Sequence, residues 1–471
     1  MTSAAGKALP SLDKGPLSLR ELRDGDRLAL LDLLDTIRGR KALVLEADFA
    51  APLSLLVEAS TLREHGVELF GVLGDGSALA SQLEDREIRQ VVYLLHTRLE
   101  SVHAAVAHVA QCRRLCSSPL EFAWLRAGLL ADVTLLPTPL SWIPLDEDLI
   151  SLELPDVFRE WTADGDPSSL HELASALSSL QQRFGAVARI KAKGTAAVEV
   201  AGLLGRMRRE QGSEGPAVGQ SGIDGMILMD RSVDIVSPAC TQLTYEGLLE
   251  ETMGIRCGQV VLESEGGRKV HGLNSSDAVF VETRDKFYMD ARRWINETLR
   301  TIQQFRDQGI HSADISALRG FVSELRDKFV RIPLHTSLIE QLAASLASPG
   351  FAARQKVEAG LLDGGDELPA ILDLMYTGEG AAAVLRLLCL YCAVHGGIPR
   401  KAYDGLRRDF LNTYGHEHLL TLAALQRAGW GGRGRRRQGY IARRVPCDFL
   451  VATTGVVSGR SLVQEFMPPG G

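Results

Sequence analysis

The sequence predicts an α/β plus all-α protein in which one α/β part is split along the chain. Three observations lead to this fold class. Short apolar segments alternate with helical periodicity in the first third, as in an α/β unit with a mostly parallel sheet. A second α/β unit begins at GMILMD (residues 225–230). A long helical stretch follows, and an apolar strand, CDFLVATTGVV (residues 447–457), returns only near the end.

The first third is expected to contain one helix and three strands. In chain order they are a helix over residues 17–37 and strands in KALVLEAD from Lys41, over residues 67–73, and in QVVYLLH from Gln90. The next segment, TLLPTPLSWIPLDEDLISLELP (residues 134–155), contains too many prolines for a continuous helix or a central strand. We interpret it as a domain connection.

The second α/β unit and the helical stretch follow from similar patterns. The expected elements are helices over residues 168–184 and 188–210, a surface loop over residues 211–225, a strand ending at Asp230, and a helix closed by Gly254. From residue 277 to residue 429, apolar residues recur at spacings of three and four. That spacing predicts an all-helical domain.

Composition excludes several classes of protein. The 471 residues carry a formal net charge of -7, which gives no general attraction to nucleic acid or to an anionic membrane. No apolar run reaches the roughly 18 residues of a membrane-spanning helix. The seven cysteines are an odd number spread over a long chain, which favours reduced thiols in the cytosol. We interpret the basic run at residues 432–444 as a solvated junction between two differing regions.

The most enzyme-like feature is ILMDRSVD, because α/β phosphotransferases place an aspartate at the carboxyl end of an apolar strand. Phosphotransferases of the haloacid dehalogenase type space two aspartates two residues apart. Here Asp230 and Asp234 are four apart, with Arg231 between them. We favour a structural role, in which these three residues form a charge and hydrogen-bond cluster that fixes the loop after the strand. Catalysis at Asp230 is the alternative hypothesis.

Other candidate sites are weak. The chain has no GxxxxGK[ST] loop, and GVLGDGSAL lacks the glycine order of a dinucleotide turn. His416 and His418 lie two apart, which would put their rings on different faces of a helix. Cys112 and Cys116 have no second pair at a matching distance. The sequence therefore predicts no catalytic, cofactor-binding or metal-binding residues.

Several motifs occur in a fixed order along the chain. The longest is MDRSVDIVSPACTQLTYEGLLEETMGI, which starts at residue 229. The others, in order, are VLEAD at residue 44, PLDEDLISLELP at 144, LNSSDAVFVETRD at 273, LRLLCLYCAVHGGIP at 385 and YGHEHLLTLAALQRAG at 414. Together they resemble the Sec/Munc (SM) family of membrane-fusion regulators, and within it the vacuolar branch.

The resemblance implies an SM-type arch of three domains. These would be an N-terminal α/β domain (residues 1–135), a central parallel-sheet α/β domain split between residues 136–255 and 438–471, and an inserted helical domain (residues 256–430) with a SNARE-binding hairpin at about residues 290–347. After QRAGW the chain passes within a few basic residues to a motif like the family's C-terminus. We therefore expect an internal segment of the family to be missing there, and the C-terminal third to fold incompletely.

The resemblance also implies a function without catalysis. The chain would bind and template SNARE helices as a subunit of the HOPS and CORVET tethers, in vesicle transport to the late endosome, lysosome or vacuole. Its expected partners are SNARE proteins, a tether subunit like vacuolar protein sorting-associated protein 16, and other HOPS/CORVET subunits, with no nucleic acid and no cofactor. It would be cytoplasmic and reach the cytosolic face of those membranes through partners. The alternative is an α/β phosphotransferase or nucleotide-binding enzyme with a helical cap.

Two groups of residues carry these expectations. The expected SNARE contacts are Glu324, Lys328, Arg331, Pro333, His335 and Ile339. The signature residues expected to act through structure are Asp230, Arg231, Asp234, Pro238, Gln242, Tyr245, Glu246 and Gly247. Pro333 is expected to break its helix. Charge reversal at Lys328 and Arg331 is expected to weaken SNARE binding with little loss of stability.

Overall fold

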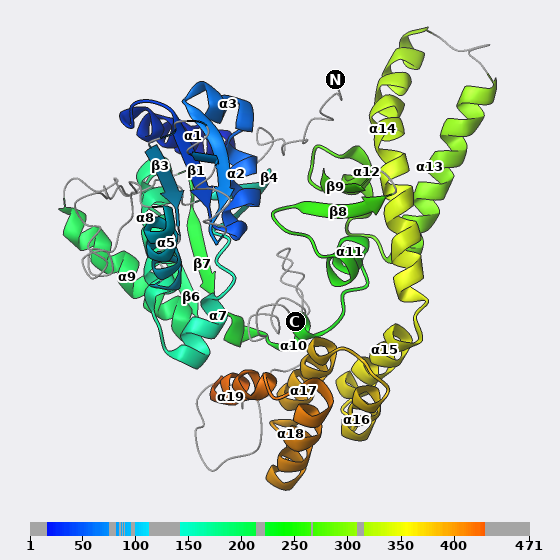
Figure 1. Cartoon of the computed structure of the whole chain (residues 1–471). Helices are drawn as coiled ribbons and strands as arrows, with labels where there is room; N and C mark the ends of the chain where they lie inside the picture. The colour runs from blue at the N-terminus through cyan, green and yellow to red at the C-terminus, as the bar shows by residue number, and fades with distance from the viewer. Residues whose placement is uncertain are drawn as a thin grey trace. The chain divides into compact units, whose positions relative to one another are not determined.

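The computed structural model describes residues 17–428, apart from residues 75–81, 84–85, 87, 89, 96–98, 113–141, 213–221, 265–266 and 309–314. The chain divides into two compact units, whose elements are labelled in Figure 1. The first unit comprises Met1–Glu153 with Arg256–Gln259 and Asn274–Ser276, and the second comprises the remainder. The predicted division into three domains stays a prediction.

The first unit is built around a parallel sheet with the strand order β2-β1-β3. Its elements are α1 (Leu19–Thr36), β1 (Lys41–Leu45), α2 (Ala50–Leu56), α3 (Ala59–Glu64), β2 (Val67–Val72), β3 (Gln90–Leu94), α5 (Leu99–Cys112), β4 (Ile143–Asp146) and β5 (Leu149–Ser151). The predicted first helix and all three predicted strands are present, and their parallel pairing is confirmed.

Helices cover both faces of this sheet. Leu43 and Leu45 of β1 pack with the apolar residues of α1, α2 and α3. Ala42 and Val44, on the opposite face, pack with α5. Because successive residues of a strand point to opposite faces, a strand buried on both sides is apolar throughout. This explains why KALVLEAD is recognisable as a strand.

The proline-rich segment is more ordered than a simple connection. Its second half forms the antiparallel hairpin of β4 and β5, in which Pro144 pairs with Ile150. A proline is tolerated there because a two-stranded sheet contains only edge strands. Ile143 packs with Leu55 and Cys257 in a small apolar cluster of the first unit.

The second unit contains two short sheets and most of the helices. Its elements are α7 (Val157–Arg159), α8 (Ser168–Phe184), β6 (Arg189–Lys193), α9 (Thr195–Gln211), β7 (Gly225–Met229), α10 (Val236–Ala239), α11 (Tyr245–Met253), β8 (Gln259–Ser264), β9 (Gly267–Gly272), α12 (Ala278–Thr283), α13 (Tyr288–Gln308), α14 (Ile315–Leu346), α15 (Pro349–Leu362), α16 (Leu368–Tyr376), α17 (Ala381–His395), α18 (Arg400–Tyr414) and α19 (His418–Arg427). β6 and β7 pair in parallel, and β8 pairs with β9.

One predicted helix is wrong at its start. The segment expected to be helical over residues 188–210 begins with strand β6 and becomes helical only at Thr195. Gly194 separates the two elements with a φ of 97°, a left-handed conformation that glycine adopts readily. The alternation Arg-Ile-Lys-Ala-Lys is a strand pattern with one polar side.

The helical part of the second unit has two apolar cores. One joins β8 and helices α11 to α14 through residues such as Tyr245, Phe280 and Leu342. The other joins α10 with helices α15 to α19 through residues such as Leu387 and Phe410. The predicted fold class, α/β units combined with a large helical region, is confirmed.

Three predictions concern residues 429–471, which lie outside the described residues. They are the returning strand at residues 447–457, the basic junction at residues 432–444, and the missing family segment. Within the described ranges, none of the helices combines the length and the apolar character needed to cross a bilayer.

Candidate functional site

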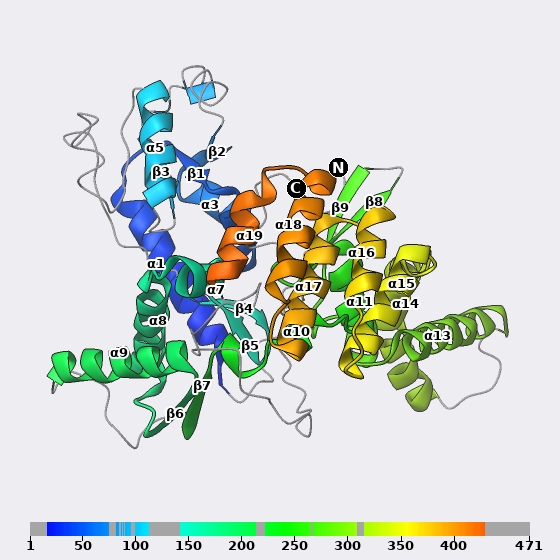
Figure 2. The same ribbon diagram turned by 90° about the horizontal axis from the view of Figure 1, so that it is seen from below.

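The predicted hairpin corresponds to α13 and α14, which contact each other and are neighbours in both views of the chain (Figures 1 and 2). α13 buries Ala291, Ile295 and Ile302, at spacings of four and seven residues that place them on one helical face. α14 buries Ile332 and Leu342 among others. Each helix thus places one apolar face in the core and leaves the other to solvent.

The structure corrects the prediction that α14 breaks at Pro333. The helix is continuous from Ile315–Leu346 and carries this proline in its interior. Proline has no N–H, so the carbonyl of Phe329 loses its helical partner at this turn. Burial of Ile332 and Leu338 on either side of Pro333 holds the helix in place against this loss.

The outer side of α14 near Pro333 is apolar. Phe329 is 52% exposed and Val330 is 67% exposed, and Pro333 is exposed beside them. The spacings of three and four residues place these side chains on one side of the helix. The Lys328 ammonium lies 5.7 Å from the ring centroid of Trp294 on α13, which links the two helices at the same level.

The six residues expected at SNARE contacts do not share one surface. Pro333 is exposed on the outer side and Lys328 is half-buried over Trp294 of α13, whereas His335 is 0% exposed and Ile339 is buried. Both face the core because they continue the spacing of Ile332, which corrects the prediction for these two residues. Glu324 lies on α14, and its side chain is outside the described residues.

Arg331 is also less exposed than expected. Its Nε lies 3.6 Å from the Oδ2 of Asp277, and its side chain is only 25% exposed while that carboxylate is fully buried. Reversing the charge of Arg331 would therefore place a second negative charge beside a buried one. The expectation that this change leaves stability unaltered is corrected, and Lys328 remains the cleaner probe.

Three buried polar side chains join the signature motif to the base of the hairpin. The Tyr245 hydroxyl lies 2.9 Å from His335 Nδ1, and His335 Nε2 lies 3.2 Å from Asp277 Oδ2. A carboxylate only accepts hydrogen bonds, so His335 Nε2 donates to Asp277, and Nδ1 pairs with the Tyr245 hydroxyl. Asp277 also accepts the backbone N–H groups of Val279 and Phe280 at the start of α12.

These three groups are placed for stability rather than for chemistry. All are fully buried, so no substrate reaches them. Burial, followed by the charge of Asp277, raises the pKa of the Tyr245 hydroxyl far above its usual value, so the phenol keeps its proton. The Phe280 ring stacks on His335 with their centroids 6.3 Å apart. The signature residue Tyr245 is thus part of a buried hydrogen-bonded group.

The remaining signature residues around α11 are also structural. Glu246 forms a two-pronged ion pair with Arg284 at 2.8 and 3.1 Å. Gly247 is buried against Gln242, so that a Cβ at this glycine would collide with that side chain. Pro238 is buried in α10.

Asp230, the aspartate at the end of strand β7, caps a neighbouring helix. Its Oδ2 accepts the backbone N–H of Ala196 at 2.9 Å and that of Ala197 at 3.4 Å, which are the free donors at the start of α9. Oδ1 accepts the N–H of Ser232 at 2.9 Å. The carboxylate therefore replaces the side chain that Gly194, at the N-cap position, lacks.

Asp234 has a separate role. Its Oδ1 accepts the backbone N–H of Ser237 at 3.0 Å, which fixes the turn into α10. Arg231 is half-buried in the short helical turn between the two aspartates. The two carboxylates therefore hold two different turns, and the predicted single cluster is in fact two local caps.

We expect Gly194→Ala to lower the free energy of unfolding by about 1–3 kcal/mol, because it combines a strained φ with displacement of the Asp230 cap. A Cβ at this position would collide with the Asp230 carboxylate. Urea unfolding measures the change. Gly202→Ala in exposed α9 is the matched control, since a Cβ there meets nothing within 4 Å, and it is expected to stabilise slightly. Equal effects of the two changes would contradict the capping role.

A buried ionic network was not predicted from the sequence. Arg386 of α17 is 3% exposed, and its guanidinium contacts both carboxylate oxygens of Glu251 at 2.6 Å. It also donates to Glu358 of α15 at 3.0 Å and to Thr241 at 2.9 Å. The only sequence signal is a single arginine within the apolar run AAAVLRLLCLYC. The network ties the signature segment to the second helical core.

No metal site is found in the part of the chain that the structure describes, where no three His, Cys, Asp or Glu side chains are grouped to hold an ion. His418 is buried against Phe410 and Tyr414 while His416 is exposed, so the two imidazoles have different surroundings. The side chains of Cys112 and Cys116 lie outside the described residues.

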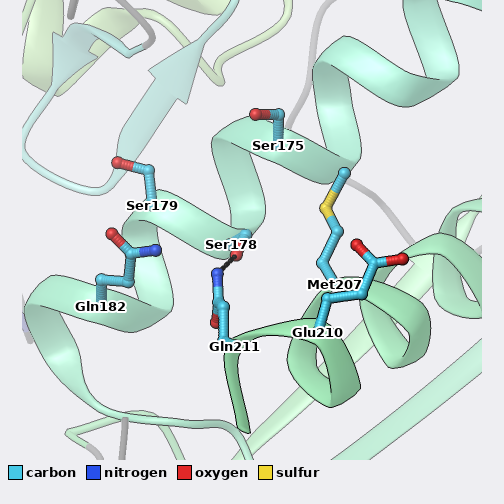
Figure 3. A pocket seen from close by; sticks show the side chains of 7 residues that line it. All are labelled: Ser175, Ser178, Ser179, Gln182, Met207, Glu210 and Gln211. Atoms are coloured by element: carbon cyan, nitrogen blue, oxygen red, sulfur yellow. Dashed lines mark hydrogen bonds between the residues drawn. The ribbon is translucent and has the colours of Figure 1, made fainter. Parts of the chain in front are cut away.

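A shallow groove of about 490 Å³ lies between α8 and α9 (Figure 3). Its lining residues are Ser175, Ser178, Ser179, Gln182, Met207, Glu210 and Gln211. Gln211 Nε2 donates to the Ser178 hydroxyl at 3.1 Å, as Figure 3 shows, so part of the polar lining is already paired. A wide-open groove lined by serines and glutamines with a single carboxylate, that of Glu210, offers little to orient a ligand.

Comparisons with known proteins agree with the motifs. A sequence profile described as the Sec1 family matches residues 41–443. The chain is 31% identical over 444 residues to the vacuolar protein-sorting-associated protein 33 homolog of Arabidopsis thaliana, with 89% of this chain and 74% of that protein covered. It is 30% identical over 459 residues to vacuolar protein sorting-associated protein 33A of Rattus norvegicus, with 89% and 75% covered.

Solved structures resemble the fold at lower identity. One chain of the Unc18-syntaxin 1 complex from Monosiga brevicollis matches with a TM-score of 0.52 and 17% identity, covering 90% of this chain and 82% of that one. The structure of Sly1p in complex with an N-terminal peptide of Sed5p matches with a TM-score of 0.51 and 17% identity, covering 86% and 74%. At this identity the likeness concerns the fold.

Proposed function

Because the chain belongs to the Sec1 family, whose members are the Sec/Munc proteins, we propose that it regulates SNARE-mediated membrane fusion by binding SNARE helices on the α13–α14 hairpin. The observation that carries the proposed site is the exposed apolar pair Phe329 and Val330 on the outer side of α14. The vacuolar protein sorting names of the relatives support a role in transport to the vacuole or lysosome.

The surface suits an amphipathic helix. SNARE motifs form coiled coils, so each carries an apolar stripe that needs a partner surface. Phe329, Val330 and Pro333 offer such a stripe on the outer side of α14, and the half-buried Lys328 faces Trp294 of α13. A helix laid along this stripe would bury apolar area on both partners while its polar side stays in water.

The base of the hairpin is held rigid beneath this stripe. His335 and Asp277 are fully buried and join α14 to the start of α12. A surface that is ordered before binding loses less conformational entropy when a partner docks. The buried residues thus support binding without touching the SNARE helix.

Membership of the HOPS and CORVET tethers belongs to the same proposal. The expected partners there are a subunit like vacuolar protein sorting-associated protein 16 and the other tether subunits. Through them the chain would act at the cytosolic face of late endosomes, lysosomes or vacuoles. The names of the relatives support this assignment in its coarse form, vacuolar protein sorting.

The phosphotransferase alternative has no support. Both carboxylate oxygens of Asp230 accept backbone N–H groups, one at the start of α9 and one in the turn after β7. Family membership also indicates a fusion regulator. The chain is not an enzyme.

The double change Phe329→Glu with Val330→Glu is expected to weaken binding of a SNARE-motif peptide at least about tenfold, since losing one buried apolar side chain costs more than 1 kcal/mol at a binding hot spot. Thermal stability should stay unchanged because both side chains are exposed. Fluorescence anisotropy with labelled SNARE-motif peptides measures the affinity. Leu362→Glu, at an exposed apolar residue of α15, is the matched control. Unaltered binding by the double variant would exclude this side of α14.

A further inference from the structure

Among the residues that the structure describes, the parallel pair of β6 and β7 has one covered face and one open face. α9 packs against both strands, and Ile190, Ala192, Met226 and Leu228 are half-buried. The alternate positions are exposed along both strands. Figure 2 shows the two strands side by side with α9 along one side of them. Parallel sheets are normally covered on both faces, so the open face needs an explanation.

The open face is divided into a cationic row and an apolar row. β6 contributes the exposed side chains of Arg189, Lys191 and Lys193. β7 contributes Ile227, which is 69% exposed, and Met229, which is 55% exposed. In the parallel register, Lys191 pairs with Ile227 and Lys193 pairs with Met229. Each apolar side chain therefore has a cation directly beside it.

The two aspartates next to β7 do not lie on this face. The carboxylates nearest to β7 in the sequence are Asp224 and Asp230, which precede and follow the strand. Both side chains are in register with the covered face, because residues two apart in a strand point to the same face. Asp230 is also committed to the N–H groups of Ala196 and Ala197 on α9.

We propose that this open face, defined by Arg189, Lys191, Lys193, Ile227 and Met229, docks an acidic amphipathic helix of a partner protein. Residues that share a strand face are about 6.6 Å apart, and residues one turn apart on a helix are about 5.4–6 Å apart. A helix of two to three turns thus matches the length of the cationic row, and one of its turns matches the spacing of the two apolar residues. Its apolar stripe would contact Ile227 and Met229, and an adjoining row of glutamates or aspartates would contact the three cations.

The arrangement favours this occupant over two others. A second copy of the chain would bring a face with the same three cations, and like charges in contact repel. An anionic bilayer attracts cations and apolar side chains together. Because lipids are mobile, a bilayer gains no affinity when the two kinds of side chain are separated into two parallel rows. An acidic helix with an adjoining apolar stripe matches both rows at once.

Binding of a designed peptide tests the proposal. The probe is a synthetic 15-residue helix with leucines along one stripe and glutamates in the next row, and the counter-probe carries lysines in place of the glutamates. We expect the full chain to bind the glutamate peptide and not the lysine peptide. Lys191→Glu with Lys193→Glu, and separately Ile227→Ser, should each weaken binding at least about tenfold. Arg206→Glu on exposed α9 should bind as the parent does.

Thermal melting and analytical ultracentrifugation accompany the titrations, since all the changed side chains are exposed and should leave the fold intact. No binding of the glutamate peptide, or equal loss in the Arg206→Glu control, would overturn the proposal. So would a dimer that Ile227→Ser dissociates, because the occupant would then be a second copy. Phosphatidylserine vesicles that bind the parent but not these variants, without peptide binding, would assign the face to a membrane.

Discussion

Replacing Arg386 with alanine is expected to lower the free energy of unfolding by about 3–5 kcal/mol, the largest effect of any single change considered for this chain. The guanidinium is 3% exposed and is the shared partner of Glu251 and Glu358. Burial alone would lower the pKa of Arg386, but the two carboxylates outweigh it and raise that pKa. The arginine is therefore charged, and its removal leaves two carboxylates in the interior without their counter-charge.

Urea unfolding at neutral pH measures this effect. Arg293→Ala is the matched control, because Arg293 is 68% exposed and pairs with Asp290 on the surface at 3.3 Å. Its loss should cost no more than about 1 kcal/mol. Adding Glu251→Gln and Glu358→Gln to the Arg386 variant should restore part of the stability, since no buried charge then remains. An Arg386 variant as stable as the control would show that water reaches these carboxylates in the folded chain.

Asp277→Ala is expected to lower the free energy of unfolding by about 2–4 kcal/mol. The change removes the cap that receives the N–H groups of Val279 and Phe280, and it also leaves His335 Nε2 without an acceptor. Each loss is costly because all of these groups are buried. Thermal and urea unfolding of the variant measure the combined loss in the free energy of unfolding.

The same carboxylate predicts an acid dependence of stability. Burial is the largest influence and on its own would raise the pKa of Asp277, but the hydrogen bond and charge of His335, the N–H of Phe280 and the charge of Arg331 together hold this pKa below its ordinary value of 3.8. A depressed pKa means that the folded state prefers the ionised form. The contribution is complete above about pH 4 and is lost as the pH falls through the lowered pKa of the folded chain.

Comparing the parent with Asp277→Asn between pH 6 and the acid limit of folding isolates this contribution. The asparagine variant should be less stable at pH 6 and should lose less stability than the parent on acidification. Parallel stability curves for the two proteins would show that Asp277 does not supply the acid dependence.

The elements predicted correctly share a strong local pattern. β1 and most of β3 are apolar and buried on both faces because helices cover both sides of their sheet. β6 was predicted as the start of a helix because its alternate residues are cations that face solvent rather than a second layer. β4 and β8 pair only with their sequence neighbours, and each contains an apolar run of no more than three residues, which does not distinguish it from a loop.

The candidate site was predicted only in part, because its decisive contacts join distant residues. The motif around Tyr245 is visible in the sequence, but its partner His335 is 90 residues away. Arg386 and Glu251 are separated by 135 residues. A single sequence shows which side chains carry charge and not which of them meet, so His335 was assigned to the surface and Arg386 was overlooked.

The most direct test of the α14 surface is amide hydrogen exchange of the full chain, measured by mass spectrometry with and without a SNARE-motif peptide at saturating concentration. Backbone amides become protected where a helix docks and excludes opening motions. The account predicts increased protection in α14 around Lys328, Phe329 and Val330 and in the facing turns of α13, with unchanged exchange in α16 and α18. Binding of the peptide with protection only outside the hairpin would contradict it.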